Sequence, residues 1–192
     1  MIGGMQTRVT AIGNPEWARL EGEVLASGVP VPLPSREAWF RLLRRDARLV
    51  TAHDASGRAV AALGLERAPT RALPGHVLLR AEHAGAALAG PSGAALIDGV
   101  RALADREARV LRLNIELVLR TPEEHRIVAE RMRAAGFHAL DHLRQYRDTL
   151  VIDLAGSEEE LLASFSSTTR RDLRGWAERP VEMRPIEDAR YG

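Results

Sequence analysis

The order in which strand-like and helix-like patterns follow one another is the feature that most constrains the fold of this chain. The sequence predicts strands over residues 8–12, 48–53, 58–66, 76–81 and 110–117. The last of these alternates clearly between apolar and polar residues with a period of two, which is typical of a half-buried strand. Apolar residues at helical spacing predict helices that begin near residues 14, 35, 93 and 121. Two helices thus separate the first two strands, and single helices precede and follow the fifth. This order predicts an α/β (α+β) domain with a mixed sheet flanked by helices.

Local signals mark several of the boundaries. Asp54-Ala55-Ser56-Gly57 is a good hairpin turn between two strands. Thr121 followed by Pro122 and Glu124 predicts a capped helix start. Ser35 is expected to cap the second helix, and the small residues of 85–93 are expected to form a loop before the helix that carries Leu96, Val100 and Leu103.

Composition excludes several classes of protein. The 192 residues include no cysteine, which rules out disulfides and thiolate chemistry and is compatible with a reducing cytoplasm. All 27 basic side chains are arginine, so no Schiff-base or catalytic lysine is available. A net charge of +1 argues against a general nucleic-acid binder. The sequence contains no run of 18 apolar residues, so we predict no membrane-spanning helix. The N-terminus lacks the apolar core of a signal peptide, and we therefore expect a cytoplasmic protein.

The segment from Asp148 to Pro185 carries the most specific pattern. Leu150, Ile152 and Leu154 alternate as in a strand, and Ser157 with Glu160 forms a capping box for a following helix. A second helical segment from about Thr168 places three arginines, at 170, 171 and 174, on a different arc from its apolar residues.

This segment resembles the junction of the Fem family, bacterial aminoacyltransferases that add bridge amino acids to peptidoglycan precursors and contain two fused GNAT-like (acetyltransferase-like) domains. The parts that carry the resemblance are Gln145-Tyr146-Arg147, the strand 150–154, the Ser-Glu-Glu-Glu-Leu-Leu run at 157–162, and the basic helix from Thr169-Arg170 to Arg174. Two positions differ from the family pattern, because Tyr146 stands in place of a proline and Thr168 in place of a frequent lysine. The order of strands and helices in the rest of the chain matches the GNAT fold.

The resemblance implies a domain organisation and a function. Residues 1–153 would form one GNAT-like domain, 154–179 a helical connector, and 180–192 the start of a second GNAT-like domain that is missing. The chain would be the acceptor-binding half of a Fem-like aminoacyltransferase, with a UDP- or lipid-linked muropeptide as acceptor and aminoacyl-tRNA as donor through the missing domain. We assign no catalytic residue, because much of the family's catalytic machinery lies outside this part. Other acylation pathways also use Fem-like proteins, so the substrate could differ.

Arginines are the candidate substrate-binding residues, because guanidinium groups suit phosphate oxygens bidentately. By the resemblance, Arg41, just after Trp39, is the best candidate for contacting the phosphates of the acceptor. The further candidates are Arg44, Arg80, Arg147, Arg170, Arg171 and Arg174. For any single arginine, an ordinary solvated surface is the competing interpretation.

Two alternatives stay open. A stand-alone GNAT N-acyltransferase would bind acetyl-CoA at the loop before the Leu96 helix, but the stretch RAEHAGAALAGPSG at 80–93 has its glycines in the wrong register and carries Glu82. We therefore expect no cofactor there. A non-catalytic remnant is the third possibility. Ser92 is interpreted as a loop or capping serine, and the six scattered histidines predict no metal site.

Overall fold

The structure of this protein is a computed structural model that describes residues 5–71, 73–140 and 155–177. The chain divides into two compact units, Met1–His138 and Ala139–Gly192, and each is described by itself. In the described residues the larger unit contains the sheet, and the smaller unit contains two helices.

Five strands form one mixed sheet in sequence order. They are β1 (Gln6–Ala11), β2 (Ala47–His53), β3 (Ala59–Pro69), β4 (Val77–Ala81) and β5 (Val110–Ile115). The first four strands pair in antiparallel fashion, whereas β4 and β5 are parallel. Parallel strands need a crossover connection, and here the crossover carries two helices, α3 (Gly85–Ala89) and α4 (Gly93–Arg106).

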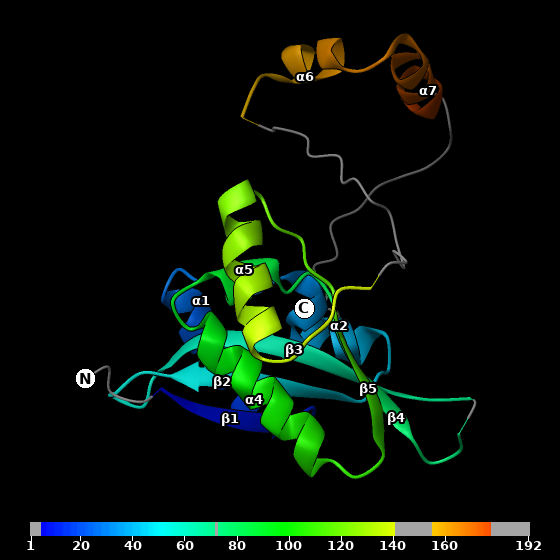
Figure 1. Cartoon of the computed structure of the whole chain (residues 1–192). Coiled ribbons are helices and arrows are strands. Elements are labelled where there is room, and N and C mark those ends of the chain that lie inside the picture. Colours follow the sequence, from blue (N-terminus) through cyan, green and yellow to red (C-terminus); the bar gives the residue numbers. More distant parts are fainter. Residues whose placement is uncertain (1–4, 72, 141–154, 178–192) are drawn as a thin grey trace. The chain divides into compact units, whose positions relative to one another are not determined.

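Helices cover both faces of the sheet (Figure 1). On one face lie α4 and α5 (Pro122–Ala134), packed with α3 over a core that includes Leu63, Leu79 and Leu96. On the other face lie α1 (Glu16–Ala26) and the short α2 (Glu37–Leu42), whose Trp17 and Phe40 rings meet edge to face at 5.8 Å. The predicted mixed sheet flanked by helices, the arrangement that the GNAT-like resemblance implied, is confirmed.

The capping and turn signals explain where several elements begin. Thr121 and Glu124 form the reciprocal capping box at the start of α5. Asp54 accepts hydrogen bonds from the Ser56 hydroxyl and from the backbone N–H groups of Ser56 and Arg58. These bonds lower the pKa of the Asp54 carboxyl, the hydroxyl of Ser56 having the largest effect.

Two local expectations are wrong. The small residues of 85–93 do not form a continuous loop, because 85–89 are a helix; alanine, the best helix former, supplies three of its five positions. Ser35 does not cap α2. It ends a 3₁₀ turn, Leu33–Ser35, that the prolines at 32 and 34 favour, and its side chain is buried while Arg36 takes the N-cap position.

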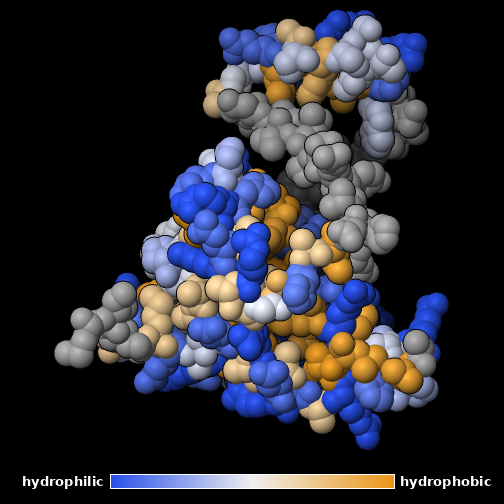
Figure 2. Space-filling model, in the orientation of Figure 1, coloured by the Kyte–Doolittle hydropathy of each residue, from blue (hydrophilic) through white to orange (hydrophobic). Residues whose placement is uncertain are grey.

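The outer strand of the described sheet carries apolar side chains that remain exposed. Apolar colour gathers over the ends of β4 and β5 at the lower right of Figure 2. Leu111 of β5 has a relative exposure of 47% and lies where the pairing of β5 with β4 shifts by one residue. Such a shift breaks the in-and-out alternation at one position, which accounts for an exposed leucine in an otherwise regular strand.

The smaller unit contains α6 (Glu158–Ser164) and α7 (Ser167–Ala177). Ser157 and Glu160 form the predicted capping box at the start of α6. The predicted strand 150–154, the motif residues 145–147 and the proposed start of a second domain at 180–192 lie outside the described residues. Within the described residues, no helix is long and apolar enough to cross a membrane.

Candidate functional site

A row of polar residues runs across three neighbouring strands on one face of the sheet. Glu66 of β3 is the register partner of Arg80 of β4, which is in turn the register partner of Asn114 of β5. Their sequence neighbours Leu65, Leu79 and Leu113 belong to the core beneath α4 and α5. Because successive side chains of a strand point to opposite faces, the three polar residues lie on the face that carries α1 and α2.

The apolar core on that face stops before the polar row. It takes its sheet residues from β2 and β3 (Ala47, Leu49, Ala59 and Ala62), and in the described part of the chain none comes from β4 or β5. The strands β4 and β5 instead present Arg80, Arg112 and Asn114 there, and Arg112 is the register partner of Leu78 one step along. Arg112 is exposed, and Arg80 and Asn114 are half-buried. We call Arg80, Arg112 and Asn114 the polar face of β4 and β5.

The side chains of the polar face have no partners among the described residues. Glu66 stands opposite Arg80, yet its Oε2 accepts a hydrogen bond from Nη1 of Arg45 at 3.0 Å. The Nε of Arg80 is buried and makes no hydrogen bond. A charged donor that is buried without an acceptor costs free energy. The unpaired Nε of Arg80 therefore requires an explanation. Binding sites are one place where such groups are kept.

The carboxyl end of the β4–β5 pair is closed by the protein's own backbone. Glu116 N–H donates to the carbonyl of Ala81 at 2.8 Å, and Ala84 N–H donates to the carbonyl of Glu116 at 2.9 Å. A Cβ placed on Gly85 would lie 2.0 Å from the carbonyl oxygen of Val118, so the segment after β5 rests directly on the start of α3. Backbone hydrogen bonds between the two segments thus continue beyond the end of β4.

Two of the predicted arginines have structural explanations within α2. Arg41 is exposed and pairs with Glu37 one helical turn earlier, with its Nη2 at 2.7 Å from Oε1. Arg44 lies just beyond the helix in a left-handed conformation, with φ of 52°. Arg44 N–H and Arg45 N–H donate to the carbonyls of Arg41 and Phe40, which is the Schellman arrangement that ends many helices. Neither arginine forms a side-chain hydrogen bond or ion pair with the polar face within the described residues.

The arginines of the basic helix are divided among different environments. Nη1 of Arg170 donates to the carbonyls of Ala163 and Phe165, so it satisfies the C-terminal end of α6. Arg171 lies 3.8 Å from Asp172 on an exposed surface, and Arg174 is exposed in the last turn of α7. Arg147 lies outside the described residues. Among the predicted arginines of the larger unit, which are Arg41, Arg44 and Arg80, Arg80 lies on the polar face.

Other groups give no catalytic arrangement in the described residues. No cluster of three or more potential metal ligands occurs in that part of the chain. His53 is buried, with Nε2 2.8 Å from the Thr51 hydroxyl and Nδ1 3.0 Å from the Gly57 carbonyl, so both ring nitrogens are used by the fold. Ser92 takes the N-cap position of α4, and its side chain makes no capping hydrogen bond.

Sequence reasoning missed Arg112 and Asn114 as site residues. The alternation over 110–117 already separates Arg112, Asn114 and Glu116 from the leucines and isoleucine. Which face of the sheet they occupy, and that Arg80 lies beside Asn114, follows only from the register of β4 against β5. The available signal was two polar residues at i and i+2, on one side of an alternating strand.

Comparisons with known proteins find similarity at the level of solved structures. No protein-family model and no curated protein matches the chain. One similar structure is a ribosomal-protein-alanine N-acetyltransferase from Brucella melitensis biovar Abortus 2308, with 17% identity over 76% of this chain and 100% of that chain, and a TM-score of 0.47. Another is a probable acetyltransferase, with 12% identity over 76% of this chain and 99% of that chain, and a TM-score of 0.45.

Proposed function

We propose that this chain is the acceptor-binding part of an acyltransferase with a GNAT-like fold, and that it does not take acetyl-CoA as donor. The observation that carries the proposal is the contrast between two neighbouring regions of the β4–β5 pair. At the carboxyl end, backbone bonds through Glu116 and the contact of Gly85 with Val118 fill the space. Beside it, Arg80 and Asn114 have no partners within the described chain.

The first region is the one that an acetyl-CoA pyrophosphate would use in a GNAT protein. Binding there relies on free backbone N–H groups at the start of the helix after β4. Here the Ala84 N–H already donates to Glu116, and Glu82 contributes a negative charge to the same loop. One N–H group of this loop is thus already used, and an incoming pyrophosphate would also meet the negative charge of Glu82. This supports a donor other than acetyl-CoA.

The finer proposal is a Fem-like aminoacyltransferase. It rests on the sequence motifs between residues 145 and 174, together with the capping box at Ser157 and the basic helix α7. The acceptor is then a UDP- or lipid-linked peptidoglycan precursor, and the donor an aminoacyl-tRNA that a second domain binds. An amine of the acceptor attacks the ester carbonyl of the donor and forms an amide bond, with no covalent enzyme intermediate. The ester C–O bond breaks, and the tRNA leaves with a ribose hydroxyl whose oxygen takes up the proton lost by the amine.

Titration calorimetry with two ligands tests the proposal. We expect a UDP-linked muropeptide to bind and acetyl-CoA to show no micromolar dissociation constant. Micromolar binding of acetyl-CoA, with protection of the amides of residues 84–93 from hydrogen exchange, establishes the stand-alone N-acyltransferase instead. Binding of neither ligand leaves a non-catalytic remnant. If the second domain supplies the chemistry, the 192-residue chain transfers no amino acid from aminoacyl-tRNA to the precursor.

A further inference from the structure

The polar face of β4 and β5 carries two cations for which the described chain provides no anion. Arg80 and Arg112 belong to neighbouring strands, and Asn114 is the register partner of Arg80 and lies two residues from Arg112. Residues two apart in a strand are separated by roughly 7 Å, so all three side chains can reach one small group. None of the three side chains hydrogen-bonds or forms an ion pair with another described residue.

The carboxylates of the same region are either neutralised or displaced along the strands. Glu66 is held by Arg45 at 3.0 Å. Glu116 follows Asn114 by two residues, and Glu82 follows Arg80 by two, so both lie at the carboxyl end of the pair. The centre of the face, between Arg80 and Arg112, therefore combines two positive charges with a neutral amide donor.

We infer that this face is a binding site for a phosphate group, with Arg80, Arg112 and Asn114 as its ligands. A phosphate ester carries up to two negative charges and presents several acceptor oxygens, which matches two guanidinium groups and one amide N–H₂. A carboxylate carries a single charge and leaves the second cation unmatched. The site differs from the arginines that the family resemblance named around α2, where Arg41 already pairs with Glu37.

This inference deepens the proposed function, because it identifies the acceptor as a phosphate-bearing molecule, but it can be tested without acyl transfer. A phosphate anchored at Arg80 and Arg112 would direct the rest of the acceptor along β5 toward Glu116. The ammonium form of an acceptor amine is attracted to the Glu116 carboxylate at this end, and it must lose a proton before the amine can attack the donor. The charge order along the strands thus orients a molecule with a phosphate at one end and an amine at the other.

The test uses thermal unfolding and amide chemical shifts of the full chain, with inorganic phosphate, pyrophosphate and UDP as probes. We expect saturable shifts in β4 and β5 and a Tm that rises with each probe. Pyrophosphate or UDP binding more tightly than phosphate points to a nucleoside diphosphate as the natural group; equal affinities point to a monoester. Chloride at equal ionic strength serves as the salt control.

Four variants make the test specific. Replacing either arginine with glutamine (R80Q, R112Q) removes one charge-assisted interaction and should weaken the probes by about ten- to a hundred-fold. R101Q removes the same charge from an exposed position of α4 and should leave affinity unchanged. E116Q removes a nearby negative charge and should strengthen binding a few-fold.

The Tm without ligand separates binding from a structural role. Because the Nε of Arg80 is buried without a partner, R80Q should keep or raise the Tm in phosphate-free buffer while its response to phosphate is lost. The inference is overturned if the wild type shows no saturable response, if R101Q weakens binding as much as R112Q, or if R80Q lowers the ligand-free Tm and E116Q leaves the affinity unchanged. Phosphate binding without any acyl transfer by the complete enzyme would remove the proposed function and leave this site intact.

Discussion

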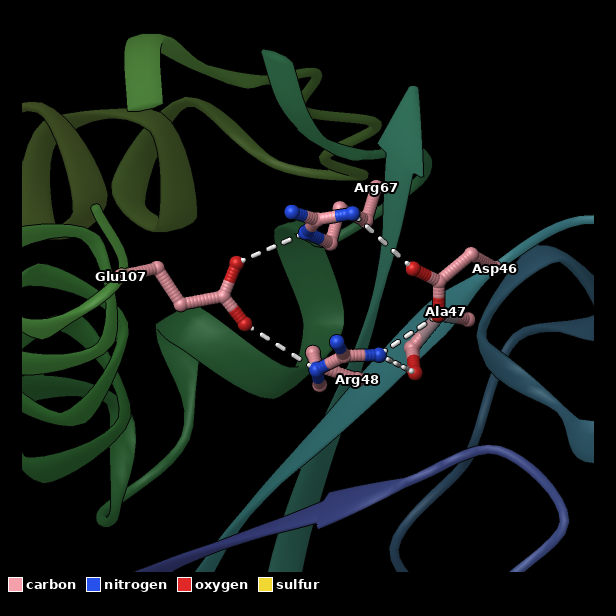
Figure 3. A network of polar contacts seen from close by, with 5 residues as sticks. All are labelled: Asp46, Ala47, Arg48, Arg67 and Glu107. Atoms are coloured by element: carbon pink, nitrogen blue, oxygen red, sulfur yellow. Dashed lines mark hydrogen bonds and ion pairs between the residues drawn. The ribbon is translucent and has the colours of Figure 1, made fainter. Parts of the chain in front are cut away.

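Replacing Glu107 with glutamine should destabilise the larger unit through a network that joins α4 to the sheet. Figure 3 shows Glu107, which caps the C-terminal end of α4, facing Arg48 of β2 and Arg67 of β3. Its two carboxylate oxygens accept from the Nε atoms of these arginines, each at 3.0 Å. Asp46 contacts the same two arginines from the other side.

The magnitude follows from what glutamine keeps and loses. One carboxylate oxygen becomes an amide N–H₂, so one of the two bonds is lost and a donor faces a guanidinium donor. A hydrogen bond to a charged group contributes about 1.5–3 kcal/mol. Glu107 is only 19% exposed, so solvent screens the interaction little, and Asp46 still neutralises part of the positive charge. We expect a loss of about 2 kcal/mol in the free energy of unfolding.

Urea denaturation followed by circular dichroism measures this change, provided that the m-value is unchanged. The matched control is E130Q, which also removes one carboxylate from an arginine. The Arg126–Glu130 pair is 57% and 56% exposed, and an exposed helical pair contributes about 0.3–0.5 kcal/mol. If E107Q and E130Q lose the same stability, the network does not hold α4 to the sheet and the argument from burial fails.

Three further predictions concern stability. Gly85→Ala should lower the free energy of unfolding by about 1–3 kcal/mol, because the new Cβ would lie 2.0 Å from the Val118 carbonyl oxygen. Gly22→Ala, whose Cβ would meet no atom within 4 Å, should stabilise the protein. Equal effects of the two substitutions in urea denaturation would disprove the contact at Gly85. Arg44→Gly should stabilise the protein by about 0.5–1 kcal/mol, because glycine adopts the left-handed φ of 52° without strain. Arg44→Ala should give no such gain. Thermal unfolding of both variants measures the difference. The pKa of Asp54 is lower in the folded state than in the unfolded state, so its carboxylate contributes to the free energy of unfolding fully above about pH 4. That contribution is lost as the pH falls further. Asp54→Asn should therefore flatten the acid limb of a plot of unfolding free energy against pH.

Much of the fold could be predicted because its signals are local. The hairpin turn at Asp54 and the capping box at Thr121 each depend on residues within four positions of one another, and the structure contains both. The strands differ from their predicted bounds by at most three residues. The helix α3 was missed because four small residues and one leucine carry no amphipathic pattern. Its packing against α4 and α5, rather than its own sequence, decides where it forms.

The candidate site was predictable only in part because it depends on register. Arg80 was identified from its place at the end of a strand, yet its nearest partners, Glu66 and Asn114, are 14 residues before it and 34 residues after it, and only the pairing of the strands unites them. Arg44 shows another limit of local patterns. The sequence predicts a binding role for its side chain, and the structure adds that its backbone ends α2 in a left-handed conformation.

The distribution of acceptors among the arginines supports a binding role for the polar face on physical grounds. Arg45, Arg48, Arg67 and Arg131 are half-buried or close to it, and each has a carboxylate or carbonyl partner. Arg80 has a similar degree of burial and an in-register glutamate opposite, but that glutamate is bound by Arg45. If stability alone had shaped this region, a direct Glu66–Arg80 pair or an apolar residue at position 80 would have served it better. The chain instead provides Glu66 with another cation and leaves Arg80 beside Asn114, which is the arrangement expected where an external anion completes the site.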